Sequence, residues 1–200
     1  LKMLQTGLTA GTWGNISARI DEDYMVITPS GMDYEKLSAD QMVIMNMNDL
    51  SYEGDLKPSI EGVVHSAVLK ARPELNAVVH THSNFALTCA TARIEIPPIC
   101  DDQVQILGGS IKLAPYTMPG SQEMADSVVE AMTDRLGCLI ANHGALTAGR
   151  TLSEAFVASQ VVEKTAMIYI NCQAIGGPSE ISQEDIDFFH EFFMEKYGQK

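Results

Sequence analysis

Two histidines separated by one residue are the first sign of chemistry in this sequence. The stretch Asn76 to Ser83 reads NAVVHTHS, an apolar, β-branched run that ends with His80 and His82. Residues two apart on a strand point to the same face, so both imidazoles can aim at one metal ion. With 5 histidines among 200 residues, this spacing arises by chance in roughly one sequence in ten. The pair alone therefore leaves a metal site and two ordinary histidines both open.

A third histidine follows a second apolar run. The segment LIANHGAL places His143 at the end of an expected strand, directly before a glycine that leaves open space beside it. A catalytic zinc ion commonly has three protein ligands and one open position, and three imidazoles meet that count. Taken alone, His143 is better explained as a solvated histidine. Only its combination with His80 and His82 favours a metal ligand.

The segment KPSIEGVVHSAVL supplies a carboxylate. Ser59 and Glu61 fit the start of a helix, Ser59 as a cap and Glu61 as a first-turn acid. Glu61 is also the carboxylate best placed for general acid–base work, because the helix leads into the strand that ends at His80. His65, one turn after Glu61, is expected on the helix surface, and an orientation toward the site is the alternative.

Two glycine-rich turns, TAGTWGNIS and ITPSGMDY, indicate an anion site. Such turns expose backbone N–H groups and short hydroxyls, which are the groups an anion requires. One such turn is weak evidence, but two of them in a chain with a strongly negative net charge predict a phosphate-sized pocket. The chain has 26 acidic and 13 basic side chains and a formal net charge of -13, which disfavours nucleic acids and anionic membranes as partners.

Strands and helices alternate along the chain. We expect strands at residues 23–29, 42–48, 76–82 and 138–143, with weaker candidates at 92–98 and 110–116. Helices are expected at 59–72, 84–92, 121–135, 152–174 and 182–198, and the last two begin with capping-box spacing. The link between the first two strands is too short for a helical crossover, so a mixed or largely antiparallel sheet in a single domain, residues 1–200, is predicted.

The four cysteines are widely spaced and form no CxxC pair. Free thiols of this kind predict a reducing, cytoplasmic location. No apolar run approaches the roughly 18 to 20 residues of a membrane helix, and no signal peptide is visible. The chain begins at Leu1 inside an apparent helix, which suggests that an N-terminal segment is missing.

Six segments in order resemble the class II aldolase/adducin family, especially its L-fuculose-1-phosphate aldolase branch. They are GTWGNIS, ITPSGMDYEKL, KPSIEGVVH, NAVVHTHS, APYTMPGS and ANHGALTAG, and the match runs from about Gly7 to about Tyr169. The resemblance implies an α/β fold, a three-layer α/β/α sandwich around a mostly antiparallel sheet. It also implies a homotetramer with active sites between subunits, and reversible cleavage of a ketose 1-phosphate to dihydroxyacetone phosphate and an aldehyde.

The resemblance also assigns roles to particular residues. It makes His80, His82 and His143 the ligands of one zinc ion per subunit, and Glu61 the acid–base residue, which also ligates zinc in the resting state. The family's phosphate-binding positions correspond to Gly14, Asn15, Ser30, Gly31 and Ser59. The family's C-terminal tyrosine corresponds to Tyr197, a further catalytic candidate.

Two departures from the aldolase pattern affect these roles. Ile60 stands where sugar-phosphate aldolases usually have a second serine, and Asp101 and Asp102 stand where the aldolase donates a tyrosine to its neighbour. Asp102 is therefore a candidate catalytic residue. One alternative is a pentulose-5-phosphate 4-epimerase of the ribulose 5-phosphate type, although epimerases of this family have an Asp at the position of Glu61. Another is a non-catalytic adducin-like binding module, although that branch of the family lacks the zinc ligands. A methylthioribulose-phosphate dehydratase is a more distant relative.

Overall fold

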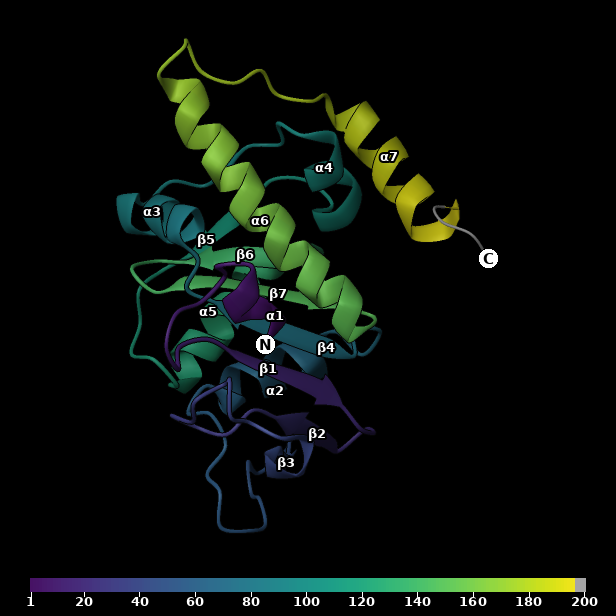
Figure 1. The fold of residues 1–200 in the computed structure, drawn as a ribbon. Coiled ribbons are helices and arrows are strands. Elements are labelled where there is room, and N and C mark those ends of the chain that lie inside the picture. The colour runs from purple at the N-terminus through teal and green to yellow at the C-terminus, as the bar shows by residue number, and fades with distance from the viewer. Residues whose placement is uncertain (197–200) are drawn as a thin grey trace.

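A seven-stranded sheet forms the centre of the computed structural model, which describes residues 1–196 (Figure 1). The strand order is β3-β2-β1-β4-β7-β6-β5. All neighbours pair antiparallel except β5 and β6, which pair parallel. The strands are β1 (Asn15–Arg19), β2 (Tyr24–Ile27), β3 (Val43–Asn46), β4 (Ala77–Thr81), β5 (Lys112–Ala114), β6 (Gly137–Ile140) and β7 (Gly144–Gly149). The predicted mostly antiparallel sheet is confirmed.

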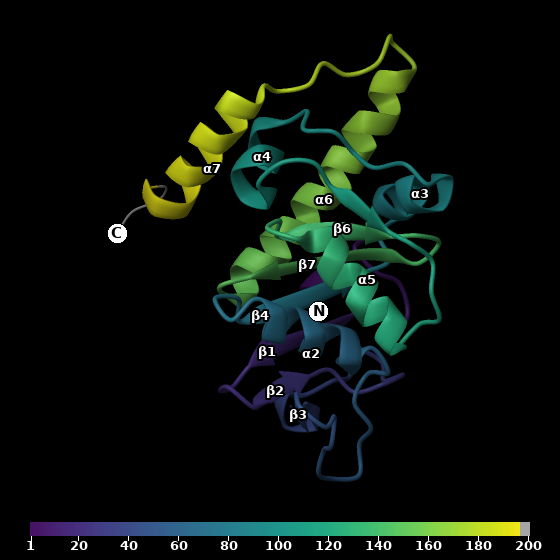
Figure 2. The same cartoon turned by 180° about the vertical axis from the view of Figure 1, so that it is seen from behind.

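Helices cover both faces of the sheet. On one face α2 (Gly62–Ala71) packs against α5 (Gln122–Met132), and on the other α6 (Leu152–Gln173) packs against α3 (Asn84–Ala92) (Figures 1 and 2). The predicted α/β/α sandwich is therefore confirmed. The remaining elements are α1 (Lys2–Gln5), a 3-10 helix (Ala39–Gln41), and α4 (Asp101–Leu107), which packs against α7 (Gln183–Lys196).

The central strand β4 is buried along its whole length. Its run of small and β-branched residues suits a strand that has helices on both faces. On one side Asn15 of β1 pairs with His80, and on the other side Leu146 of β7 pairs with the same residue. The end of β4 therefore carries His80 into the middle of the sheet, between two strands distant in sequence.

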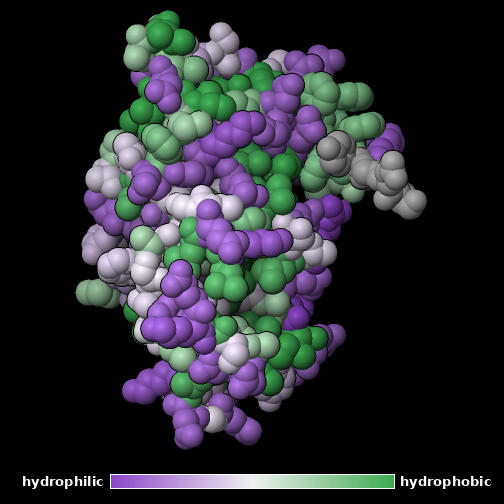
Figure 3. All heavy atoms as spheres, viewed as in Figure 1, coloured by the Kyte–Doolittle hydropathy of each residue, from purple (hydrophilic) through white to green (hydrophobic). Residues whose placement is uncertain are grey.

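The helix ends follow the capping signals in the sequence. Thr151 Oγ1 accepts a hydrogen bond from the backbone N–H of Glu154 (3.1 Å), and Ser182 Oγ accepts one from that of Asp185 (3.2 Å). The face of the molecule seen in Figure 3 mixes hydrophilic and hydrophobic side chains. Within residues 1–196 no helix is both long and apolar enough to cross a membrane.

Four parts of the secondary structure differ from the sequence prediction. The strands β1 and β7 and the helix α4 were not predicted. Both strands contain small or polar residues, and pairing on two sides stabilises them in place of local propensity. The expected strand at 92–98 is wrong, because α3 extends to Ala92 and Ile96 forms only an isolated bridge with Ile111.

Candidate active site

Three histidines from two parts of the sheet form one cluster. His80 lies in β4, His82 follows its last residue, and His143 lies in the turn between β6 and β7. Their ring centroids are 4.8 to 5.0 Å apart, and their nitrogen ligand atoms all lie within 4.8 Å of one another. The backbone N–H of His143 bonds to the carbonyl of Ile140 (3.0 Å), which closes the turn that presents this ring.

The hydrogen bonds of His80 fix the direction of its free lone pair. His80 Nδ1 lies 3.0 Å from the carbonyl oxygen of Ala145 on β7. Because a carbonyl can only accept, Nδ1 carries the hydrogen and Nε2 carries the lone pair. That Nε2 atom lies 2.9 Å from Nε2 of His82. The lone pair of His80 therefore points into the histidine cluster.

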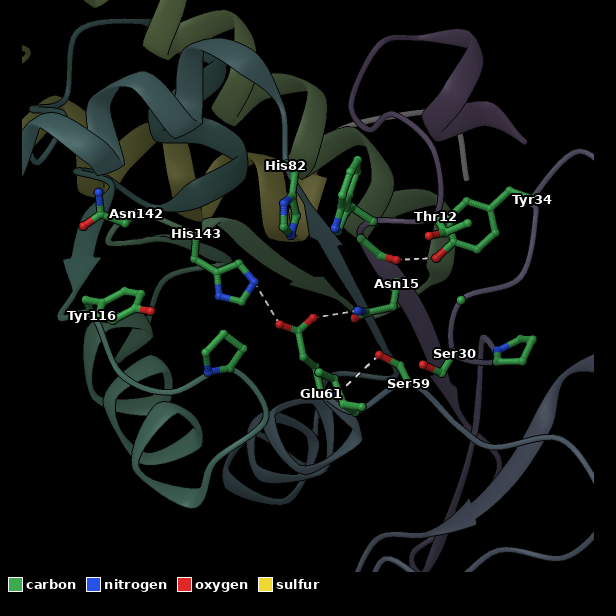
Figure 4. Close-up of a pocket in the computed structure, with 16 residues that line it drawn as sticks. Thr12, Asn15, Ser30, Tyr34, Ser59, Glu61, His82, Tyr116, Asn142 and His143 are labelled. Carbon is green, nitrogen blue, oxygen red and sulfur yellow. Dashed lines mark hydrogen bonds and ion pairs between the residues drawn. The ribbon is translucent and has the colours of Figure 1, made fainter.

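Glu61 lies directly beside the histidine cluster (Figure 4). Its carboxylate oxygens lie 2.9 Å from His143 Nε2 and 3.4 Å from His80 Nε2, and Asn15 Nδ2 donates to Glu61 Oε2 at 2.6 Å. Burial opposes ionisation of Glu61, but attraction to His80 and hydrogen bonds from His143 and Asn15 outweigh it and lower the pKa of this carboxyl. Glu61 is therefore a buried, ionised carboxylate at neutral pH.

Burial favours the neutral form of two histidines of the cluster, His82 and His80. Burial, together with repulsion from His80 and His143, lowers the pKa of His82 to about 4. Burial is also the main cause of a lowered pKa at His80. Neutral imidazoles have lone pairs available for a metal, and an adjacent carboxylate adds one negative charge. The donor atoms thus fit a divalent cation, and nitrogen-rich sets of this kind suit zinc.

A cleft of about 440 Å³ joins the histidine cluster to the two glycine-rich turns. Ser30 and Ser59 lie on one side of Glu61, and Tyr116 and Asn142 lie on the other (Figure 4). The predicted phosphate-binding residues all line this cleft, namely Gly14, Asn15, Ser30, Gly31 and Ser59. The structure therefore brings together Glu61, two of the three histidines and both turns around one cavity.

Gly14 brings the first turn into contact with the metal-site strand. Its φ of 75° is in the left-handed region, and a Cβ atom here would lie 2.7 Å from the carbonyl oxygen of His80. The hydroxyl of Tyr34 donates a hydrogen bond to the carbonyl of Gly14, which ties the two turns together. Tyr34 is buried, and burial raises the pKa of its hydroxyl. Sequence reasoning missed Tyr34, although it belongs to the SGMDY motif.

The other predicted residues have different positions. Ser59 Oγ accepts a hydrogen bond from the backbone N–H of Glu61 (3.3 Å), so Glu61 itself is the N-cap of α2. Asp102 lies in α4, where it pairs with Lys164 of α6, and it is not among the residues that line the cleft in the described chain. Tyr197 lies outside the described residues. Catalytic roles for Asp102 and Tyr197 stay predictions.

One expectation near the site is wrong. His65 was expected on the surface of α2, but it is fully buried and faces β1, where its Nδ1 atom lies 2.7 Å from Ser17 Oγ. Burial lowers the pKa of His65 to about 3, so the ring is neutral. The sequence shows the position of His65 along the helix, but not which side of α2 the sheet covers.

Comparison with known proteins agrees with this geometry. A family model described as the class II aldolase and adducin N-terminal domain matches residues 1–170. The chain belongs to the class II aldolase/adducin family. Metal dependence is a property of class II aldolases, and the histidine cluster gives this family member a site for the ion.

Several relatives match nearly the whole chain. The 5-deoxy-D-ribulose 1-phosphate aldolase of Bacillus thuringiensis serovar kurstaki is 36% identical over 200 residues, 100% of this chain and 93% of the relative. The L-fuculose phosphate aldolase of Escherichia coli K12 is 36% identical and covers 99% of this chain and 91% of the relative. A solved L-fuculose 1-phosphate aldolase structure has a TM-score of 0.91 at 31% identity, covering 96% and 91% of the two chains. These relatives are named as aldolases, the aldehyde-lyases expected from the sequence.

Two glycines of β7, Gly144 and Gly149, allow the stability of the sheet and the geometry of the histidines to be tested separately. A Cβ at Gly144 would collide with the carbonyl of Thr81 and come within 3.3 Å of the His80 ring, whereas one at Gly149 would lie 2.5 Å from the backbone nitrogen of Ala155. We expect Gly144→Ala and Gly149→Ala each to cost about 1–3 kcal/mol.

Only Gly144→Ala should also weaken metal binding, because only that methyl group displaces a histidine of the cluster. Thermal unfolding of the metal-free proteins and zinc titration of each variant would measure the two effects. Zinc affinity reduced equally in Gly149→Ala would contradict this separation.

Proposed function

We propose that this protein is a zinc-dependent class II aldolase. It reversibly cleaves a ketose 1-phosphate, such as L-fuculose 1-phosphate, to dihydroxyacetone phosphate and an aldehyde. The observation that carries the proposal is the position of the Glu61 carboxylate, 2.9 Å from His143 Nε2, in the cleft that the two glycine-rich turns also line. A sugar phosphate held by the turns would extend across Glu61 toward Tyr116 and Asn142 (Figure 4).

His80, His82 and His143 would hold the ion, with Glu61 as a further ligand in the resting state. When bound, a divalent cation stabilises the negative charge that develops on the substrate's oxygen atoms as the C–C bond forms or breaks. Zinc is proposed because three imidazoles and a carboxylate form its common donor set. The Nδ1–H bond from His80 to Ala145 (3.0 Å) keeps that ligand in the required tautomer.

The chain's own residues orient the substrate and move its proton. The hydroxyls of Ser30 and Ser59 and the N–H groups of the turns would bind the phosphate and so fix the ketose over Glu61. In the direction of synthesis, the ionised Glu61 removes a proton from the hydroxymethyl carbon of dihydroxyacetone phosphate, and in cleavage it returns that proton. The hydrogen bonds from Asn15 and His143 hold the carboxylate in place for both steps.

The wider proposal concerns assembly and location. A homotetramer with active sites at subunit interfaces would allow Asp102 and Tyr197 to reach a neighbouring site, which suits the position of Asp102 outside its own cleft. A cytoplasmic location fits the four cysteines, which are all free thiols. Sedimentation velocity of the purified protein would measure the assembly.

Replacing Glu61 by Gln tests the acid–base role. The amide keeps the shape of the side chain but cannot accept a proton, so we expect kcat to fall by about 10²- to 10⁴-fold. Zinc content should stay close to one ion per subunit, because the three histidines remain. The matched control is Glu53→Gln, which changes an exposed carboxylate that is not among the residues lining the cleft. Full turnover by Glu61→Gln would remove Glu61 from the mechanism.

Replacing Tyr34 by Phe tests the phosphate site. Loss of its hydrogen bond to Gly14 frees the first turn, so we expect phosphate to bind about two- to tenfold more weakly, the usual value of one hydrogen bond. Trp13 lines the cleft and is the only tryptophan of the chain, so its fluorescence can follow a titration with inorganic phosphate. Tyr24→Phe, at a residue 42% exposed, is the control and should bind phosphate normally.

A panel of sugar phosphates tests the reaction itself. The zinc-loaded protein should release dihydroxyacetone phosphate from L-fuculose 1-phosphate or 5-deoxy-D-ribulose 1-phosphate, because both share carbons 1 to 3. Coupled oxidation of NADH by glycerol-3-phosphate dehydrogenase would measure that product. Epimerisation of ribulose 5-phosphate without release of a three-carbon fragment would replace the aldolase proposal by the epimerase alternative.

A further inference from the structure

A buried histidine that the mechanism does not use lies one helical turn from Glu61. His65 has an exposed fraction of 0%, and its Nδ1 atom lies 2.7 Å from Ser17 Oγ. Its Nε2 atom has no hydrogen-bond partner among residues 1–196. Burying an imidazole with one unpaired nitrogen costs free energy. Packing alone therefore does not explain a histidine at this position.

The hydrogen bond between His65 and Ser17 is one of two side-chain hydrogen bonds that join α2 and its N-cap to β1. Asn15 and Ser17 are two residues apart on β1 and share a face, and Glu61 and His65 are four apart on the first turn of α2. Asn15 Nδ2 donates to Glu61 Oε2 at 2.6 Å, and Ser17 Oγ lies 2.7 Å from His65 Nδ1. Both ties are buried, with Ser17 at 1% exposed.

We propose that His65 is a positioning residue for Glu61, and that its bond to Ser17 holds the start of α2 where the Glu61 carboxylate reaches His143 and Asn15. This inference rests on the proposed acid–base role of Glu61. The backbone N–H of His65 donates to the carbonyl of Glu61 (3.2 Å), so the anchored residue is one hydrogen bond from the residue that it positions.

The local backbone explains why Glu61 needs this anchor. Glu61 is the N-cap of α2, with φ -89° and ψ 9°, so it lies at the end of the helix and not within it. The next residue is Gly62, where a Cβ atom would lie 2.7 Å from Met45 Sδ, so the start of α2 packs closely against Met45. Before Glu61, Ser59 Oγ accepts a 3.3 Å hydrogen bond from the backbone N–H of Glu61, and the backbone N–H of Ser59 donates to Thr28 (3.0 Å), which lies outside β1. After the Asn15–Glu61 bond, the side chain of His65 is therefore the next attachment of this turn to β1.

The helix contains a matched control for the Ser17–His65 bond. Ser66 is the neighbour of His65, is 3% exposed, and its hydroxyl donates to the carbonyl of Met47 at 2.6 Å. That bond also ties α2 to the rest of the molecule through a buried serine, but it does not involve β1 or the turn that holds Glu61. Ser17→Ala and Ser66→Ala should therefore lower the melting temperature similarly, by about 2–4 °C for each kcal/mol lost.

The two serine variants should differ in turnover and in local exchange. We expect Ser17→Ala to lower kcat about tenfold with KM within about twofold, and Ser66→Ala to leave both unchanged. In the metal-free proteins, Ser17→Ala should speed hydrogen exchange of the Val64 and His65 amides, which donate to the Glu61 carbonyl. Ser66→Ala should leave the exchange of these two amides unchanged. Equal kcat in the two variants, or unchanged exchange in Ser17→Ala, would overturn the proposal.

Substitution of His65 gives a second and independent measurement. The side-chain amide of Asn can replace Nδ1 of His65, whereas that of Gln replaces the unpaired Nε2. We therefore expect His65→Asn to retain most of kcat and His65→Gln to lose it, and equal loss in both would count against the bond to Ser17. If Glu61→Gln is fully active, the proposed acid–base role of Glu61 fails. If Glu61→Gln is inactive while Ser17→Ala turns over normally, only the role of His65 fails.

Discussion

The hydrogen bond from His80 Nδ1 to the carbonyl of Ala145 is the interaction on which the site depends. It joins the central strand β4 to β7 and turns the lone pair of His80 toward His82 and His143. Gly14 approaches the backbone of His80 from the β1 side, and Gly144 approaches Thr81 from the β7 side. Larger residues at either glycine would separate the strands, so the sheet itself sets the geometry of the donor atoms.

Charge in the site is arranged around a single carboxylate. Burial lowers the pKa of His80 and of His82, whereas attraction to His80 and hydrogen bonds from His143 and Asn15 lower the pKa of Glu61. A buried carboxylate without such partners would take up a proton instead. One carboxylate beside three imidazoles is a donor set that suits a divalent cation and leaves the carboxylate within reach of a substrate.

Buried polar ties connect the parts of the cleft. Tyr34 joins the second glycine-rich turn to Gly14, and Asn15 and Ser17 join β1 to the start of α2. In each case the buried side chain is polar, and desolvating it costs free energy that an apolar side chain would not lose. Each of these hydrogen bonds also sets the distance between groups that would act on the same substrate. The other end of the cleft lacks such a buried bond at Asn142. This residue is exposed, and its side chain accepts a hydrogen bond from Arg93 at the surface.

The sequence by itself determined the local chemistry. The spacing of His80 and His82, the NHG segment, the two glycine-rich turns and the helix caps are short-range patterns, so strand alternation and capping rules were enough to find them. It did not determine which faces are buried. His65 was misplaced, β1 and β7 were missed, and the tie of Tyr34 to Gly14 could not be foreseen. Those features depend on contacts between residues far apart in the chain, such as the 48 positions between Ser17 and His65. Only the packed sheet and helices decide them, because burial and pairing there override local propensity.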